Sequence, residues 1–218
     1  MLFVDFQFLP FFALVFSVHW ALRSPRARKA WLLLSSYAFY AAWDWRFLSL
    51  ILFSTLVDYV VGRRLATTRH RKGWLLVSLV SNLGLLGYFK YANFFLDSAI
   101  SFLGALGLHP HAPSLEVLLP VGISFYTFQT LSYSIDVYRR RLEPERDLLD
   151  LALFVGFFPQ LVAGPIIRAV DFLPQLKAPV RLERTDIRAA VVLFFVGFVK
   201  KAAISDSIAP HVDAYFAD

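Results

Sequence analysis

The chain has 218 residues, of which 58% are hydrophobic and 17% charged, and its mean hydropathy is +0.58. Soluble globular domains carry about 45–50% apolar and roughly 25% charged residues, so this composition indicates a membrane protein. The net charge of +6 does not indicate a nucleic-acid partner, because the basic residues fall in short gaps between apolar runs. The chain contains no cysteine, which excludes disulfides and thiol chemistry.

Apolar segments follow one another along the chain and predict an all-α polytopic membrane protein, since a membrane helix needs about 17–25 residues. The segments cover residues 6–22, 31–61, 74–108, 115–138, 148–167 and 187–217. The first segment has no positive charge before it and no small-residue cleavage site after it, so we expect a span and not a cleaved signal peptide. A basic cluster follows it at 23–29, which predicts a cytoplasmic loop there and an external N-terminus.

The segment 31–61 is long enough for two helices and contains AAWDWRF at 41–47. Tryptophans and an acidic–basic pair suit a membrane–water interface, so we expect a helical hairpin with its turn at 41–47. The basic loops 63–72 and 139–141 both favour the cytoplasm. Because three full crossings between them would separate these loops, we expect the stretch 81–91, with its glycines and Lys90, to be a broken or re-entrant element.

The segment 115–138 carries polar residues at helical spacing. A rotation of about 100° per residue places four of them on one face: Gln129, Ser132, Tyr133 and Asp136. Tyr126 and Thr130 lie beside this face, and Phe128, Leu131 and Ile135 lie opposite, where we expect lipid.

Two interpretations of this polar face remain open. It joins neighbouring helices, with Asp136 neutralised by Arg139 or Arg140, or it forms the wall of a polar path through the bundle.

The sequence FFPQLVAGPIIR, residues 157–168, places helix breakers inside an apolar run. Proline removes a backbone donor, and such a break is tolerated in a membrane only where protein or water surrounds it. Pro159 and Pro165 therefore predict a bend or a re-entrant segment, with Gln160 and Arg168 facing an interior path or its cytoplasmic mouth. A span kinked by proline is the alternative. A polar connector at 171–188 follows.

Other polar residues give weaker signals. Asp58 lies close to Arg63 and Arg64, so we expect it to pair with an arginine at a helix end and not to act in catalysis. His109 and His111 lie in a proline-rich loop without further ligands, so we expect no metal site. Motifs of serine hydrolases, P-loop proteins, dinucleotide-binding proteins and zinc proteases do not occur.

Two stretches resemble the membrane-bound O-acyltransferase family: LPVGISFYTFQTLSYSIDVYR at 119–139 and FFPQLVAGPIIR at 157–168. Three further stretches, 36–45, 82–95 and 197–206, resemble the same family in the same order. The branch is that of bacterial polysaccharide O-acetyltransferases, so the resemblance implies transfer of an acyl group, in this branch acetyl, to hydroxyls of an exported polysaccharide such as alginate.

The resemblance also implies a fold, a donor and partners. It implies a bundle of transmembrane helices with broken or re-entrant segments that form part of a funnel, in the bacterial inner membrane. It implies no bound cofactor, a donor such as acetyl-CoA or another cytoplasmic acyl carrier, and a periplasmic partner protein besides lipid and polysaccharide. We expect five residues to line the substrate path: Gln129, Tyr133, Asp136, Gln160 and Arg168.

The sequence departs from the family pattern in one respect. The catalytic histidine of the family follows a tryptophan in a segment C-terminal to all five stretches, and none of the five histidines here has that context. We therefore expect residues 1–218 to form the N-terminal half of one membrane-embedded acyltransferase domain, without a catalytic residue of its own. A non-catalytic membrane scaffold or a transport component with a polar helix-lined path is the alternative.

Overall fold

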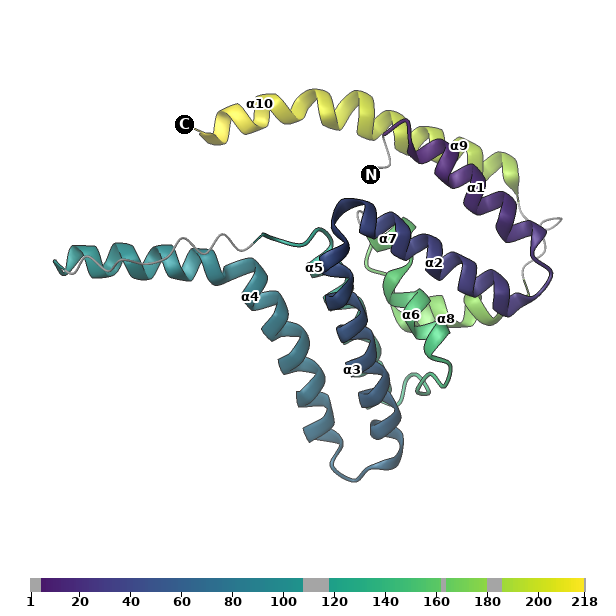
Figure 1. Cartoon of the computed structure of the whole chain (residues 1–218), viewed down its shortest axis with the longest axis horizontal. Helices are drawn as coiled ribbons and strands as arrows, with labels where there is room; N and C mark the ends of the chain where they lie inside the picture. Colours follow the sequence, from purple (N-terminus) through teal and green to yellow (C-terminus); the bar gives the residue numbers. More distant parts are fainter. Residues whose placement is uncertain (1–4, 108–117, 162–163, 180–185, 218) are drawn as a thin grey trace. The chain divides into compact units, whose positions relative to one another are not determined.

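The computed structural model describes residues 5–107, 118–161, 164–179 and 186–217. The described part of the chain is helical and contains no strand. It divides into two compact units, of which residues 18–177 form the larger. Figure 1 labels the helices, whose bounds are α1 Phe8–Ala21, α2 Pro25–Asp44, η1 Trp45–Phe47, α3 Leu48–Thr67, α4 Arg71–Ala105, α5 Ile123–Tyr138, α6 Leu148–Gly156, α7 Phe158–Leu161, α8 Ala169–Lys177, α9 Ile187–Val199, η3 Lys200–Ser205 and α10 Asp206–Ala217.

The helical hairpin predicted for 31–61 is present as α2 and α3. Ser24 caps the start of α2, where Pro25 occupies the first turn. Asp44 ends α2, caps the 3₁₀ turn η1 and pairs with Arg46 at 2.7 Å, so the turn lies within the predicted stretch 41–47. By length and composition, the stretch Pro25–Thr67, which contains both hairpin helices, and α4 are apolar enough to cross a membrane.

Helix α4 corrects the expectation of an interruption at 81–91. It runs unbroken from Arg71 to Ala105, a length of about 52 Å at 1.5 Å per residue. It is bent, as Figure 1 shows. Gly84 and Gly87 have open space where a side chain would begin, so packing does not require glycine at either position.

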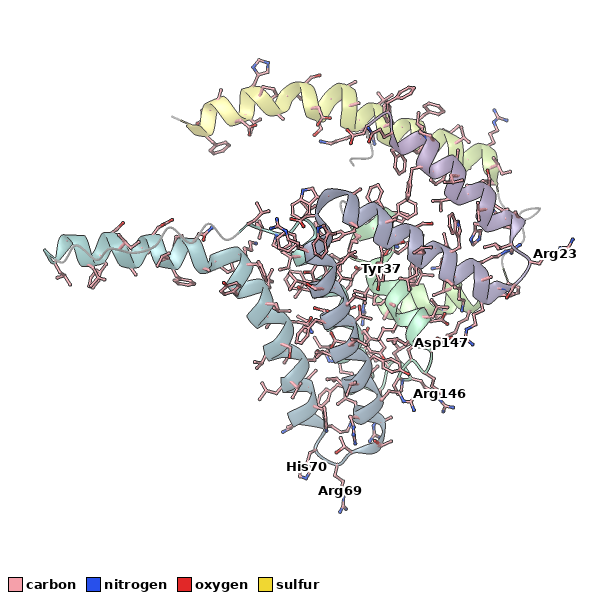
Figure 2. The ribbon with its side chains drawn as sticks, viewed as in Figure 1. Arg23, Tyr37, Arg69, His70, Arg146 and Asp147 are labelled. Atoms are coloured by element: carbon pink, nitrogen blue, oxygen red, sulfur yellow. The ribbon has the colours of Figure 1, made fainter. Side chains whose placement is uncertain are left out.

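Helices α3, α4 and α5 pack together and form much of the core. The basic ends of α3 and α5 lie at the same end of the bundle as the start of α4, because residues of all three line one pocket. Figure 2 shows Arg69 and His70 at the tip of the loop between α3 and α4. The two basic loops thus lie together, as the sequence predicted.

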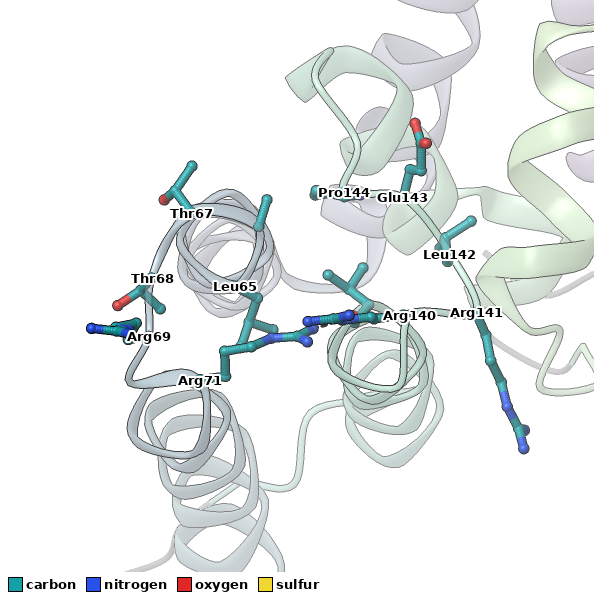
Figure 3. A pocket seen from close by; sticks show the side chains of 12 residues that line it. Leu65, Thr67, Thr68, Arg69, Arg71, Arg140, Arg141, Leu142, Glu143 and Pro144 are labelled. Carbon is teal, nitrogen blue, oxygen red and sulfur yellow. Dashed lines mark hydrogen bonds between the residues drawn. The ribbon is translucent and has the colours of Figure 1, made fainter.

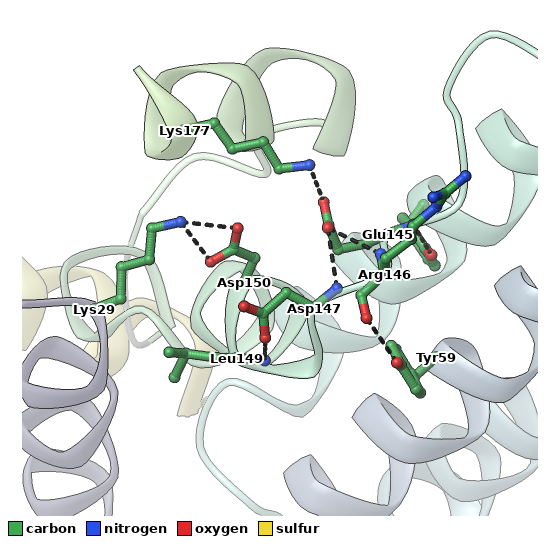
Figure 4. A network of polar contacts seen from close by, with 9 residues as sticks. Lys29, Tyr59, Glu145, Arg146, Asp147, Leu149, Asp150 and Lys177 are labelled. Atoms are coloured by element: carbon green, nitrogen blue, oxygen red, sulfur yellow. Dashed lines mark hydrogen bonds and ion pairs between the residues drawn. The ribbon is translucent and has the colours of Figure 1, made fainter. Parts of the chain in front are cut away.

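The loop between α5 and α6 is fixed by polar contacts (Figure 4). Glu145 pairs with Lys177 of α8 at 2.6 Å and accepts backbone N–H bonds from residues 146 and 147. Lys29 of α2 pairs with Asp150 of α6 at 2.7 Å. Because both carboxylates are almost fully buried, these pairs hold α6 and its preceding loop against α2 and α8.

The predicted segment 148–167 is not one helix. Helix α6 ends at Gly156, Phe157 has an extended backbone, and the short helix α7 follows. The polar connector expected at 171–188 is helical at its start, where α8 extends to Lys177.

The smaller unit contains α9, η3 and α10, which occupy the predicted segment 187–217. The segment η3 is a π-helix that begins at Lys200. Lys201 forms an ion pair with Asp206, the residue that follows η3, so one of the two adjacent lysines, Lys200 and Lys201, is neutralised within the unit.

Candidate functional site

Helix α5 presents the predicted polar face to the protein interior. Gln129, Tyr133 and Asp136 expose 2% or less of their surface. Tyr126 and Thr130 beside them are also buried, whereas Phe128 on the opposite side is 45% exposed. The periodicity of the sequence therefore placed these residues on the buried side of α5 correctly, although Ser132 of the same predicted face is only partly buried.

The prediction was wrong for one residue of the expected lipid face. Leu131 is 5% exposed and belongs to the core. It lies about 40° from Thr127 around the helix, and Thr127 is itself buried. The arc of α5 that packs against protein is therefore wider than the polar residues alone indicate.

Residues 157–161, the first part of the break, lie directly against this polar face. Gln129 Nε2 donates a hydrogen bond of 3.1 Å to Gln160 Oε1 on α7. Asp136 lies seven residues after Gln129 on α5, and its Oδ1 accepts a hydrogen bond of 2.5 Å from Arg168 Nη2. These four predicted residues, which we call the polar seam, thus meet in two pairs between α5 and residues 158–168.

The pairing of Asp136 differs from one interpretation of the sequence. Arg139 and Arg140 follow it in the chain, but its ion pair is with Arg168, 32 residues away. The carboxylate is 2% exposed and the guanidinium side chain 48% exposed. Asp136 therefore ties the segment after the break to α5.

Tyr133 has a separate role in the structure. Its hydroxyl accepts a hydrogen bond of 2.9 Å from the backbone N–H of Glu145. The same hydroxyl lies against Gly62, where a Cβ atom would collide with the ring. Tyr133 therefore fixes the loop after α5 against α3, in addition to any contact with a substrate path.

Backbone contacts hold the break in place. Ser36 Oγ on α2 accepts the Phe158 N–H at 3.2 Å, at the first residue of α7. Gly122, before α5, has a φ of +77°, and a Cβ there would overlap the carbonyl oxygen of Leu161. A left-handed backbone and this close approach both require glycine. Helices α2, α5 and α7 are thereby locked together around residues 157–161.

Several buried polar atoms of α5 have no hydrogen-bond partner among the described residues. They are Tyr126 Oη, Gln129 Oε1 and Asp136 Oδ2. Buried polar atoms in proteins nearly always have a partner, including ordered water or a ligand. The polar seam therefore has capacity for further hydrogen bonds beyond its two internal pairs.

A second polar group, which we call the Asp58 cluster, was missed by the sequence reasoning. Asp58 on α3 is fully buried and accepts hydrogen bonds from Ser78, from Asn82 at 2.8 Å and from Ser134 at 2.6 Å. Thr130 in turn donates to Asn82 Oδ1 at 3.2 Å. The expected pairing of Asp58 with an arginine is wrong, because its carboxylate points between α4 and α5 and not toward Arg63 or Arg64.

The sequence contains a pattern from which the Asp58 cluster could have been predicted. Ser78 and Asn82 are four residues apart on α4, and Thr130 and Ser134 are four residues apart on α5. Residues at this spacing share one face of a helix. Two such polar pairs in apolar helices, with one carboxylate in a third, indicate a buried cluster.

The described residues contain no group of three or more histidine, aspartate or glutamate side chains that could hold a metal ion. His109 and His111 lie outside the described residues. His19 contacts Trp20, with 5.4 Å between the ring centroids.

The sequence is similar to known acetyltransferases over its whole length. It is 40% identical over 222 residues to the probable alginate O-acetylase AlgI of Pseudomonas aeruginosa, covering 100% of this chain and 42% of that protein. The corresponding protein of Azotobacter vinelandii is 41% identical over 217 residues, covering 97% of this chain and 42% of that protein. The peptidoglycan O-acetyltransferase of Helicobacter pylori is 33% identical over 241 residues, covering 97% of this chain and 45% of that protein.

The chain therefore spans less than half the length of these relatives. No family model matches the chain. No solved structure matches it either.

Proposed function

Because the chain belongs to the membrane-bound O-acyltransferase family, we propose that it forms part of an enzyme that transfers an acyl group, in this case acetyl, to hydroxyls of an exported polysaccharide. The proposal covers the domain assignment too: residues 1–218 are the N-terminal half of one membrane-embedded domain. The alginate and peptidoglycan acetylases named above support polysaccharide as the acceptor class.

The observation that carries this proposal is the junction of the polar seam with the helix break. A path for an acyl donor or acceptor through a membrane needs buried polar groups on helices and backbone that can leave the helix. The Gln129–Gln160 hydrogen bond joins one such helix face to one such break. Unpaired acceptor atoms on α5 supply hydrogen-bond capacity for a substrate or for water along that path.

The proposal includes an arrangement in the membrane. The segment 157–168 is a broken or re-entrant part of the funnel, with Arg168 at its cytoplasmic mouth. The protein lies in the bacterial inner membrane, with the basic loops 63–72 and 139–141 in the cytoplasm and the N-terminus in the periplasm.

The donor and partners complete the proposal. The donor is acetyl-CoA or another cytoplasmic acyl carrier, and no cofactor is permanently bound. A periplasmic partner protein receives the acyl group or presents the polysaccharide. As the family resemblance implies, a histidine in another part of the enzyme removes the hydroxyl proton, a role for which its pKa near neutrality suits it.

The first test is genetic. Deletion of the gene should lower the O-acetyl content of the exported polysaccharide, measured by NMR of the purified polymer, while the amount of polymer stays the same. Unchanged acetylation with normal export would refute the transferase proposal. Loss of export itself would favour the transport alternative.

The second test addresses the polar seam. Gln129→Leu and Gln160→Leu in the intact protein should each lower acetyl transfer by about fivefold or more, because a polar group left unpaired in this part-buried pair costs about 1–3 kcal/mol. Membrane insertion, measured by fractionation and protease accessibility, should not change. Gln175→Leu is the matched control, because Gln175 is exposed and bonds only within α8. Normal transfer in both seam variants would mean that these residues only pack.

A further inference from the structure

An open pocket of about 500 Å³ lies where the loop between α3 and α4 meets the loop after α5. It is separate from the polar seam. Four arginines line it, Arg69 and Arg71 from the first loop and Arg140 and Arg141 from the second (Figure 3). The two basic loops of the sequence thus contribute to one site.

The positive charge of this pocket is not neutralised within the described part of the chain. None of the four arginines forms an ion pair there with a carboxylate. Glu143 supplies negative charge to the lining, which leaves a net charge of 4 − 1 = +3. Like charges held this closely repel one another, and a concave site of one sign concentrates ions of the opposite sign.

Arg71 is held in place by the end of α5. Its Nη2 donates to the carbonyl oxygens of Val137 at 3.0 Å and Tyr138 at 2.9 Å, and its guanidinium lies 5.4 Å from the centre of the Tyr138 ring. Its Nε is buried and has no hydrogen-bond partner among the described residues. The guanidinium is therefore pre-positioned by the end of α5.

Arg140 faces Arg71 from the other loop. In Figure 3 the two side chains point toward one another, whereas that of Arg141 points away. Arg140 has a φ of +58°, the left-handed conformation of the residue that follows a helix end, where the N–H groups of Arg140 and Arg141 donate to the carbonyl oxygens of Val137 and Asp136. The end of α5 therefore fixes the backbone of Arg140 from which its side chain extends toward the pocket.

We propose that this pocket binds a phosphate group, carried either by the headgroup of an anionic phospholipid or by a soluble phosphate compound. Guanidinium groups bind phosphate oxygens through paired, charge-assisted hydrogen bonds, and two of them converge here. The basic loops mark this end as cytoplasmic, where anionic lipid and soluble phosphates are both available. The site does not depend on acyl transfer.

The test is binding to the intact protein, purified in a neutral detergent and followed by thermal unfolding. A ligand that binds the folded state raises the melting temperature in a concentration-dependent way. Inorganic pyrophosphate tests the soluble source, and short-chain phosphatidylglycerol, compared with phosphatidylcholine, tests the lipid source. Stabilisation by pyrophosphate alone identifies a soluble ligand, and stabilisation by phosphatidylglycerol alone identifies a lipid headgroup.

The variant Arg69→Gln/Arg140→Gln should weaken binding of the active probe by about tenfold or more. Both side chains are exposed and make no hydrogen bond through their guanidinium groups in the described part of the chain, so the variant should fold normally. Arg23→Gln/Arg26→Gln is the matched control, since it removes the same charge from exposed positions at the start of α2. Figure 2 shows Arg23. No stabilisation of the unmodified protein by either probe, or an equal loss of binding in the control, would overturn the proposal.

Discussion

Removal of the Asp58 carboxylate should destabilise the bundle more than any other single change of charge in α3, α4 or α5. Asp58 is fully buried and joins three helices, because its partners Ser78 and Asn82 lie on α4 and Ser134 on α5. Asp58→Ala would leave three donors facing an apolar gap. Asp58→Asn keeps the shape of the side chain but replaces one acceptor atom with a donor.

The magnitude can be worked from the structure. Each buried donor left without a partner costs about 1–3 kcal/mol. Serine hydroxyls can turn back to a carbonyl four residues earlier, as Ser36 does with Leu32, which reduces their cost. Asn82 also donates to the Ser78 carbonyl at 3.0 Å. We therefore expect about 3 kcal/mol for Asp58→Ala, near the lower limit for three donors, and about 1–2 kcal/mol for Asp58→Asn, because the serine hydroxyls can reverse and accept.

The assay is unfolding of the intact protein in detergent, followed by intrinsic fluorescence as temperature or denaturant rises. Asp97→Asn is the matched control, because Asp97 is an exposed carboxylate on α4. Stability should decrease in the order Asp97→Asn, Asp58→Asn, Asp58→Ala, with the control close to the unmodified protein. A loss below about 1 kcal/mol for Asp58→Ala, or an equal loss in the control, would show that the cluster does not hold the three helices together.

Two further changes test the contacts of α5. Arg168→Gln should lower the free energy of unfolding by about 1–3 kcal/mol, less than the loss of a fully buried ion pair, because Arg168 is 48% exposed. In a double-mutant cycle of thermal stabilities, adding Asp136→Asn should restore part of that loss. Additive effects would mean that the two charges do not interact. Gly62→Val should destabilise the protein by about 1–3 kcal/mol, because its Cβ would collide with the Tyr133 side chain. Gly73→Val is the control, because Gly73 has open space around it. Equal effects of the two substitutions would leave only helix propensity as the cause.

Local patterns predicted those parts of the fold that local physics determines. The hairpin turn at 41–47 follows from tryptophans, an aspartate cap and an arginine within a few residues. The buried face of α5 follows from the helical repeat, which places Gln129, Tyr133 and Asp136 together whatever they contact. The break before Pro159 follows from the missing backbone donor of proline.

Contacts between distant segments could not be predicted in the same way. Asp58 is adjacent in sequence to a basic loop, yet its partners are 20, 24 and 76 residues away. Asp136 has arginines three and four residues later, yet it pairs with Arg168. In both cases proximity in sequence suggested the wrong partner, because the direction of a side chain around its helix decides what it can reach.

The two polar groups are connected through α5. Going around the helix at about 100° per residue, Asp136, Gln129, Tyr133, Thr130 and Ser134 fall in this order within an arc of about 160°. One edge of the arc contacts Gln160 and Arg168, and the other edge contacts the Asp58 cluster. A rotation of α5 that improved one set of contacts would break the other, so the two sets together fix its orientation. The Asp58 cluster therefore acts on the polar seam indirectly: it determines where Gln129 and Asp136 point, although it does not touch the segment that they hold.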